Sequence, residues 1–257
     1  MKNRMTRRAL LTLLGPALFA TRLLSQAALP SAESLLDRYA QVTGGKQAYE
    51  NRKTEFTRGT IEAVAQGLKG TVVRYADISG NYYSSLEITG IGKIEEGVRD
   101  GIAWERSDLL GSRIKEGVER AQALREATLN AVYRWRNLYP KVETTGIETV
   151  NGEECYRVVL TPAEGKPETL YLARQSGLAV RMTTVSATQM GDVPGEMLMS
   201  QFRDFDGVLQ PAKIVQRAAG QELVLTIETI QVNAPIPAGR FDFPADVKAL
   251  LDKRPKP

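Results

Sequence analysis

The chain has 257 residues, of which 42% are hydrophobic and 25% are charged, as in globular proteins with a substantial core. It contains no histidine, which excludes Ser-His-Asp and Cys-His catalytic pairs and zinc sites built on imidazole. The single cysteine, Cys155, excludes a disulfide within the chain and is expected to be a small apolar side chain in a strand.

Residues 1–27 are typical of a secretory signal peptide. A basic start is followed by an apolar run over residues 9–20, and small residues surround Ser25 and Ala27. The apolar run is too short to span a bilayer, which takes roughly 20 residues. We expect cleavage after Ala27, with Ala20 and Ala28 as alternatives. The pair Arg7-Arg8 leaves the twin-arginine and general secretory routes both open.

Removal of the signal peptide changes the charge of the protein. Five of the 34 Lys and Arg residues lie in residues 1–27, which hold no Asp or Glu, so the remaining chain has 29 basic and 30 acidic residues. This near-neutral balance gives no reason to expect a nucleic-acid partner. We therefore predict a periplasmic protein with a single domain over residues 28–257.

The first elements after the signal peptide are helical. Ser31 can cap a helix in which Leu35, Leu36 and Tyr39 recur at helical spacing, and Gly44-Gly45 ends it. A short second helix is predicted over residues 46–52.

From residue 55 the pattern changes to the alternation of β-strands. Strands punctuated by glycines are predicted up to residue 104, and Asp100-Gly101 is a tight hairpin turn.

Residues 113–139 interrupt the strands. Apolar residues at steps of three and four, with charged residues between them, predict one long amphipathic helix that ends before Pro140. Its apolar positions include Ile114, Val118, Leu124, Val132 and Trp135.

The second half returns to strands with clear turn signals. Asn151-Gly152, Ser176-Gly177, Asp206-Gly207 and Ala219-Gly220 separate runs of about ten residues, which is typical of an antiparallel meander. The fold class is therefore mainly β with a few helices (α+β).

The sequence carries no phosphate-binding loop or Gly-x-Ser-x-Gly motif, and Asp204 and Asp206 lie beside a turn where exposure is expected. We predict no catalytic residues, no metal site and no cofactor. An enzyme acting through tyrosine or carboxylate groups is the least favoured alternative.

Aromatic and methionine side chains are the most suggestive candidates for a binding site. Methionine adapts to irregular apolar partners, and an incompletely filled sheet face would leave an apolar pocket, although the same residues suit an ordinary core. The predicted apolar-ligand residues are Tyr83, Trp104, Ile114, Val118, Leu124, Val132, Trp135, Met182, Met197 and Met199.

Several short stretches, mostly of turn and packing residues, occur in a fixed order over residues 31–244. They include Thr43-Gly44-Gly45, Arg58-Gly59-Thr60-Ile61, Asp100-Gly101-Ile102-Ala103-Trp104-Glu105, Val150-Asn151-Gly152, Asp204-Phe205-Asp206-Gly207 and Phe241-Asp242-Phe243-Pro244. This order of motifs resembles the LolA/LolB-like superfamily of envelope proteins, and within it the group of outer-membrane lipoprotein-sorting proteins.

This resemblance implies a single curved antiparallel sheet, or half-open β-barrel, with helices covering its concave face. It also implies a carrier for a lipid or the acyl chain of a lipoprotein, working as a monomer with a membrane-associated donor or acceptor protein. The alternative is an envelope protein-interaction or stress-sensing module without lipid cargo. If the helix over 113–139 covers the ligand, replacing Val132 or Trp135 by Asp should abolish lipid binding and leave the sheet folded.

Overall fold

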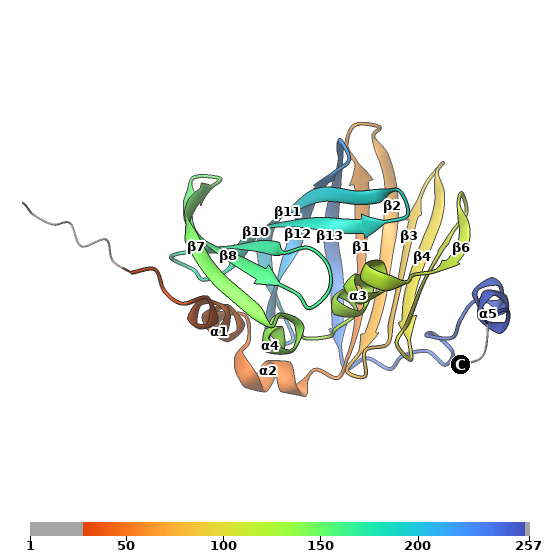
Figure 1. Cartoon of the computed structure of the whole chain (residues 1–257), viewed down its shortest axis with the longest axis horizontal. Helices are drawn as coiled ribbons and strands as arrows, with labels where there is room; N and C mark the ends of the chain where they lie inside the picture. The colour runs from red at the N-terminus through yellow and green to blue at the C-terminus, as the bar shows by residue number, and fades with distance from the viewer. Residues whose placement is uncertain (1–27, 255–257) are drawn as a thin grey trace, which may run out of the picture.

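The computed structural model describes residues 28–254, which form thirteen strands in one antiparallel sheet and five helices. Figure 1 shows the sheet curving around the helices α1, α3 and α4. The predicted mainly β, curved-sheet class is confirmed, and the predicted signal peptide lies outside the described residues. The strands are β1 Thr54–Ala63, β2 Leu68–Asp77, β3 Tyr82–Ile88, β4 Gly92–Arg99, β5 Ile102–Ser107, β6 Gly111–Ile114, β7 Lys141–Val150, β8 Glu153–Thr161, β9 Glu168–Ala173, β10 Ala179–Thr188, β11 Gly191–Phe205, β12 Val208–Ala218 and β13 Gln221–Val232.

The sheet consists of two meanders, which are joined by pairing of the first strand, β1, with the last strand, β13. Strands β1 to β6 follow one another across one half, and β7 to β13 across the other. Pairing of β1 with β13, which are far apart in the sequence, unites the halves in a register that aligns Ile61 with Leu225. The edge strands β6 and β7 do not pair with each other, so the sheet is open and is not a closed barrel.

The hairpin turns follow the sequence signals. At Asp100-Gly101, Asn151-Gly152 and Asp206-Gly207 both turn residues have positive φ, between 50° and 86°. Two-residue hairpins of this kind match the right-handed twist of the strands, and Asn, Asp and Gly tolerate the backbone that they need. The predicted meander turns are confirmed.

The helices are α1 Ala32–Val42, α2 Gly45–Asn51, α3 Gly117–Glu126, α4 Trp135–Leu138 and α5 Ala245–Asp252. Ser31 caps α1 as predicted, because its Oγ accepts a hydrogen bond from the Ser34 amide at 3.2 Å. Within residues 28–254, no helix combines the length and the apolar character that crossing a bilayer requires.

The prediction of one long helix over residues 113–139 is wrong. Ile114 ends strand β6, and the rest divides into α3, a run of turns and the short α4. Asn130, with φ 62°, interrupts the helical backbone, and its side-chain Nδ2 donates to the carbonyl oxygens of Tyr49 and Arg52 at 2.9 and 3.1 Å. The apolar periodicity persists through the break because both helical pieces face the same side of the sheet.

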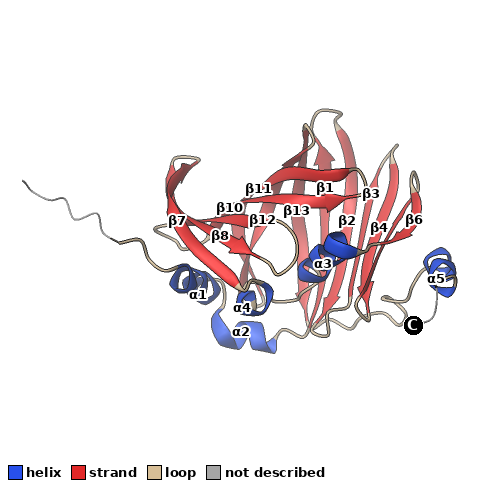
Figure 2. Ribbon diagram, in the orientation of Figure 1, coloured by secondary structure: helices blue, strands red, loops and turns tan. Residues whose placement is uncertain are grey.

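Helices cover both faces of the sheet but at different places. Helices α1, α3 and α4 lie on the inner, concave face (Figure 2). The segment after β13 runs across the outer face of the first meander, where Phe241, Phe243 and Val247 pack against Tyr83 and Trp104. The two faces of the sheet are therefore covered by different segments of the chain.

Candidate ligand cavity

An apolar cavity of about 300 Å³ lies on the inner face, between the helices and strands β8 to β11. Its helical wall consists of Leu36 and Tyr39 from α1, Val132 from the turns before α4, and Trp135 and Leu138 from α4. The sheet contributes Leu160, Leu170, Met182, Met197 and Met199. The volume is at the lower end of the range for small-molecule pockets, and the lining has their mainly apolar character.

Strand register explains why these sheet residues meet. Met182 of β10 pairs with Leu170 of β9 on one side and with Met197 of β11 on the other. Directly opposed residues of an antiparallel pair point to the same face, so the three side chains form a continuous apolar floor. Met199 extends that floor, because it lies two residues beyond Met197.

A polar clasp fixes α4 to α1 above this floor. The Trp135 indole Nε1 donates to Asp37 Oδ1 at 3.2 Å, and Arg136 donates to both oxygens of the same carboxylate at 2.7 and 2.8 Å. These hydrogen bonds, led by that from Arg136, hold the pKa of Asp37 below its ordinary value. The Trp135 ring, which is 6% exposed, is thereby held against the cavity.

One corner of the cavity is polar and contains two carboxylates. Glu168 is buried and fully engaged, since Arg125 Nη2 lies 3.3 Å from its Oε1 and Tyr139 donates its hydroxyl to Oε2 at 2.7 Å. Burial and this carboxylate together raise the pKa of Tyr139. Glu126 lies at the end of α3, and within residues 28–254 its one side-chain hydrogen-bond donor is the Gln122 amide, at 2.9 Å.

A second hollow, of about 370 Å³, continues along the same face of the sheet. Its apolar lining includes Ile61, Val72, Ile214 and Leu225 of β1, β2, β12 and β13. The charged residues Arg74, Glu96 and Glu105 of β2, β4 and β5 also line it. Met197 lines both hollows, so they adjoin one another. The inner face therefore carries a trough longer than the first cavity alone.

Helix α3 lies across this trough and is anchored at both sides. It packs on Val98 and Ala103 of β4 and β5 through Leu124 and Ala127. At the other side the Gln122 side-chain oxygen accepts a hydrogen bond from the Ala187 amide of β10 at 3.1 Å. The helix thus bridges the two meanders over the hollow (Figure 1).

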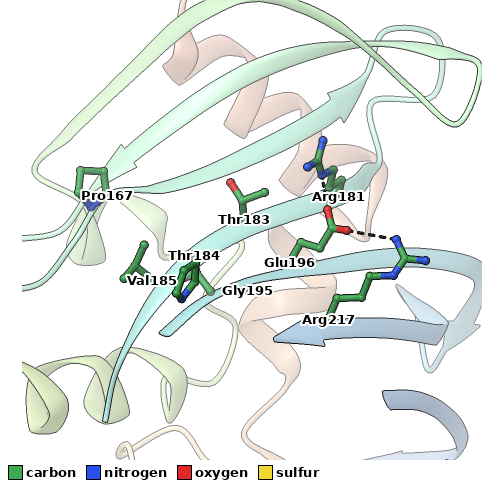
Figure 3. Close-up of a pocket in the computed structure, with 9 residues that line it drawn as sticks. Pro167, Arg181, Thr183, Thr184, Val185, Gly195, Glu196 and Arg217 are labelled. Carbon is green, nitrogen blue, oxygen red and sulfur yellow. Dashed lines mark hydrogen bonds and ion pairs between the residues drawn. The ribbon is translucent and has the colours of Figure 1, made fainter. Parts of the chain in front are cut away.

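Figure 3 shows a different kind of hollow, of about 430 Å³, on the outer face of β10 to β12. Glu196 lies between Arg181 and Arg217, with N–O distances of 2.8 and 3.2 Å. Arg181 also pairs with Glu148 and Arg217 with Glu222. Each of these charged side chains is paired with an opposite charge on another strand, so the cluster links the strands of this half of the sheet.

The structure separates the residues predicted to bind an apolar ligand. Val132, Trp135, Met182, Met197 and Met199 line the inner cavity. Leu124 packs beneath α3 against β4 and β5, and Val118 is 44% exposed at the start of α3. These two lie outside the cavity wall.

The other three predicted residues, Tyr83, Trp104 and Ile114, lie on the opposite face of the sheet from the cavity. The paired positions Tyr83, Gly97 and Trp104 all point outward, and Tyr83 and Trp104 continue a row of rings with centroids 6.4 Å apart. Trp104 occupies the space left by the absent side chain of Gly97, where a Cβ would lie 2.4 Å from its ring. Strand alternation could have revealed this, because it depends only on the register of β4 with β5.

The sequence interpretation missed several cavity residues. Leu36 and Tyr39 were recognised as the apolar side of a helix, but nothing in the sequence showed which strands they would cover. Leu160 and Leu170 follow the alternation of their strands and carried no separate signal. Glu126 was not among the predicted site residues.

The sequence matches one protein family over about half of its length. Residues 122–247 match a family described as a domain of unknown function (DUF4412). No match was found among curated proteins. The part that matches the family runs from α3 through the second meander to α5 and includes most of the sheet side of the cavity.

Solved structures resemble the whole described chain at low sequence identity. A LolA superfamily protein from Nitrosomonas europaea is 12% identical, with a TM-score of 0.57 over 84% of this chain and 99% of that one. A putative outer-membrane lipoprotein-sorting protein domain from Vibrio parahaemolyticus is 10% identical, with a TM-score of 0.57 over 86% and 100%. A DUF1329 family protein from Desulfovibrio piger ATCC 29098 is 13% identical, with a TM-score of 0.56 over 82% and 97%. The protein therefore has the LolA-like fold, as its sequence motifs indicated.

Proposed function

We propose that the inner cavity binds the apolar chain of a lipid or of a lipid-modified protein, and that the protein is a non-enzymatic carrier for it in the periplasm. The observation that supports this most directly is the unfilled apolar space between α1, α4 and the sheet. In this proposal, residues 1–27 are the cleaved signal peptide and residues 28–257 form the carrier domain.

The lining suits a ligand that is recognised by its apolar surface. Each methylene group transferred from water to such a site contributes about 0.8 kcal/mol, so a long chain binds without many directed contacts. The three methionines of the floor can adjust to chains of different shape. The adjoining hollow beyond Met197 gives a longer chain room to continue.

The fold supports the same proposal by analogy. One of the similar structures is described as a putative outer-membrane lipoprotein-sorting domain. By analogy with that description, we propose a membrane-associated donor or acceptor protein as a partner of this chain. No nucleic-acid partner is proposed.

A charge placed in the cavity wall should test the assignment. Val132 lines the cavity, whereas Val118, at the start of α3, is 44% exposed and lies outside it. We expect Val132→Asp to weaken binding of a fluorescent hexadecyl probe at least about tenfold, because the carboxylate must be desolvated beside the chain. Val118→Asp should bind the probe like the wild type. Val132 is preferable to Trp135, whose replacement by Asp would also break the clasp with Asp37.

Equal probe binding by both variants, with circular dichroism showing the sheet intact, would contradict the cavity assignment. Protein purified from membranes without lipid, and unable to take up the probe, would instead favour an envelope interaction or stress-sensing module of the same fold.

A further inference from the structure

Glu126 differs from the other carboxylates near the cavity in having no cationic partner. Glu168 pairs with Arg125, and Glu96 with Lys115 at 2.7 Å. Among residues 28–254, the Gln122 amide is the only side chain that donates a hydrogen bond to Glu126, and no Lys or Arg forms an ion pair with it. One oxygen of a carboxylate on the cavity wall is left for another donor.

Glu126 is an exposed residue that lines the cavity, so its carboxylate is open to a ligand that enters there. Desolvation by the protein atoms around the concave site raises its pKa, and the nearby carboxylates of Glu96 and Glu168 raise it further, against opposing effects of Gln122 and Lys115.

The neighbouring cations cannot readily neutralise Glu126. Lys115 lies between Glu96 and Glu105, at 2.7 and 3.5 Å, and Arg125 is held by Glu168 and by the Glu164 carbonyl oxygen. Arg74, which forms no ion pair within the described chain, lines the adjoining hollow and not this cavity. The polar corner therefore attracts positive charge and repels negative charge.

We propose that Glu126 selects the polar end of the ligand, accepting a hydrogen bond from a protonated amine attached to the apolar chain. This inference rests on the proposed function, because the chain must occupy the cavity for its end to reach the corner. Specificity of this kind comes from a polar group of the binding site that attracts the charge of the correct ligand and repels the charge of the wrong one.

Three probes with the same chain separate charge from apolar binding. Hexadecylamine, hexadecanol and hexadecanoate are compared, each below its micelle concentration, by displacement of a fluorescent apolar probe from the mature protein. Wild-type protein should bind the amine about tenfold more tightly than the carboxylate, the size expected for a charge-assisted hydrogen bond.

Glu126→Gln is the diagnostic variant, because it keeps the size of the side chain and removes its charge. It should lower the amine-to-carboxylate preference about tenfold and leave hexadecanol binding unchanged. Glu116→Gln is the matched control: it removes the same charge from the beginning of α3, where Glu116 pairs with Arg254 and its side chain is 73% exposed. This variant should retain the wild-type preference.

Each outcome bears on a different claim. If hexadecanol binds but wild type shows no preference for the amine, or if Glu126→Gln keeps that preference, the selectivity inference is overturned and the apolar cavity stands. If none of the three probes binds to folded protein, the proposed function is overturned and the inference with it.

Discussion

Single residues in this protein take their roles from the face of the sheet on which they lie. Trp104 and Met197 are both large apolar residues of strands, yet Trp104 is sealed under the C-terminal segment and Met197 borders two hollows. Residue type suggested both as candidates for apolar binding. Strand alternation and register place the two residues on opposite faces, and packing of segments from elsewhere in the chain decides which face carries the cavity.

The titration of Glu126 provides a test at the residue scale. Desolvation by the surrounding protein raises its pKa in the folded protein, so the folded state binds the proton more tightly than the unfolded chain does. The resulting stability is fully present at pH values below the unfolded pKa and is lost as the pH rises through the higher, folded pKa.

Because Glu126→Gln does not titrate, its Tm relative to wild type should increase between about pH 4 and about pH 7.5. Thermal unfolding of both proteins at the two pH values measures this change. A Tm difference that stays constant, or that falls towards neutral pH, would show that the carboxylate is not held in the surroundings described.

The elements differ in how far the sequence predicts them. Helix α1 and the hairpin turns could be predicted because their signals are local: a Ser cap, a pair of glycines, and Asn-Gly or Asp-Gly at each turn. The segment 113–139 could not, since its interruption is held by Asn130 hydrogen bonds to the backbone near α2, about eighty residues earlier. A periodic apolar pattern shows that a segment faces a core and does not show that its backbone is continuous.

The β12–β13 hairpin supplies a test at the element scale. Its first turn residue, Ala219, has φ 49°, a conformation that alanine adopts at a cost of about 1–2 kcal/mol. Asn151, with φ 50°, occupies the same place in the β7–β8 turn. Ala219→Asn should therefore raise the free energy of unfolding by about 1 kcal/mol, measured by urea denaturation.

The reciprocal change, Asn151→Ala, should lower the free energy of unfolding by a similar amount. If both substitutions destabilise the protein, side-chain contacts at these turns outweigh the backbone preference, and the turn argument is incorrect.

At the scale of the whole molecule, the open sheet is what makes a cavity available. Within residues 28–254, β1 and β13 are the strands through which the two meanders pair, and α3 bridges them. The helices that cover the inner face come from separate parts of the chain. Two short helices and one bridging helix do not fill the concave surface, and the remaining space is lined by Leu, Met and aromatic side chains. The architecture could be predicted from turn spacing and family motifs, whereas the location of the space could not.

The methionine methyl groups report on this space most directly. In residues 28–257 the methionines are Met182, Met197 and Met199, which line the cavity, and Met190, which is 92% exposed at the β10–β11 turn. Carbon-13 methyl spectra recorded while hexadecanol is added should show the three cavity resonances shifting together and the Met190 resonance unchanged. If the cavity resonances stay in place at saturating ligand, or if Met190 shifts as much as they do, the ligand does not bind between the helices and the sheet.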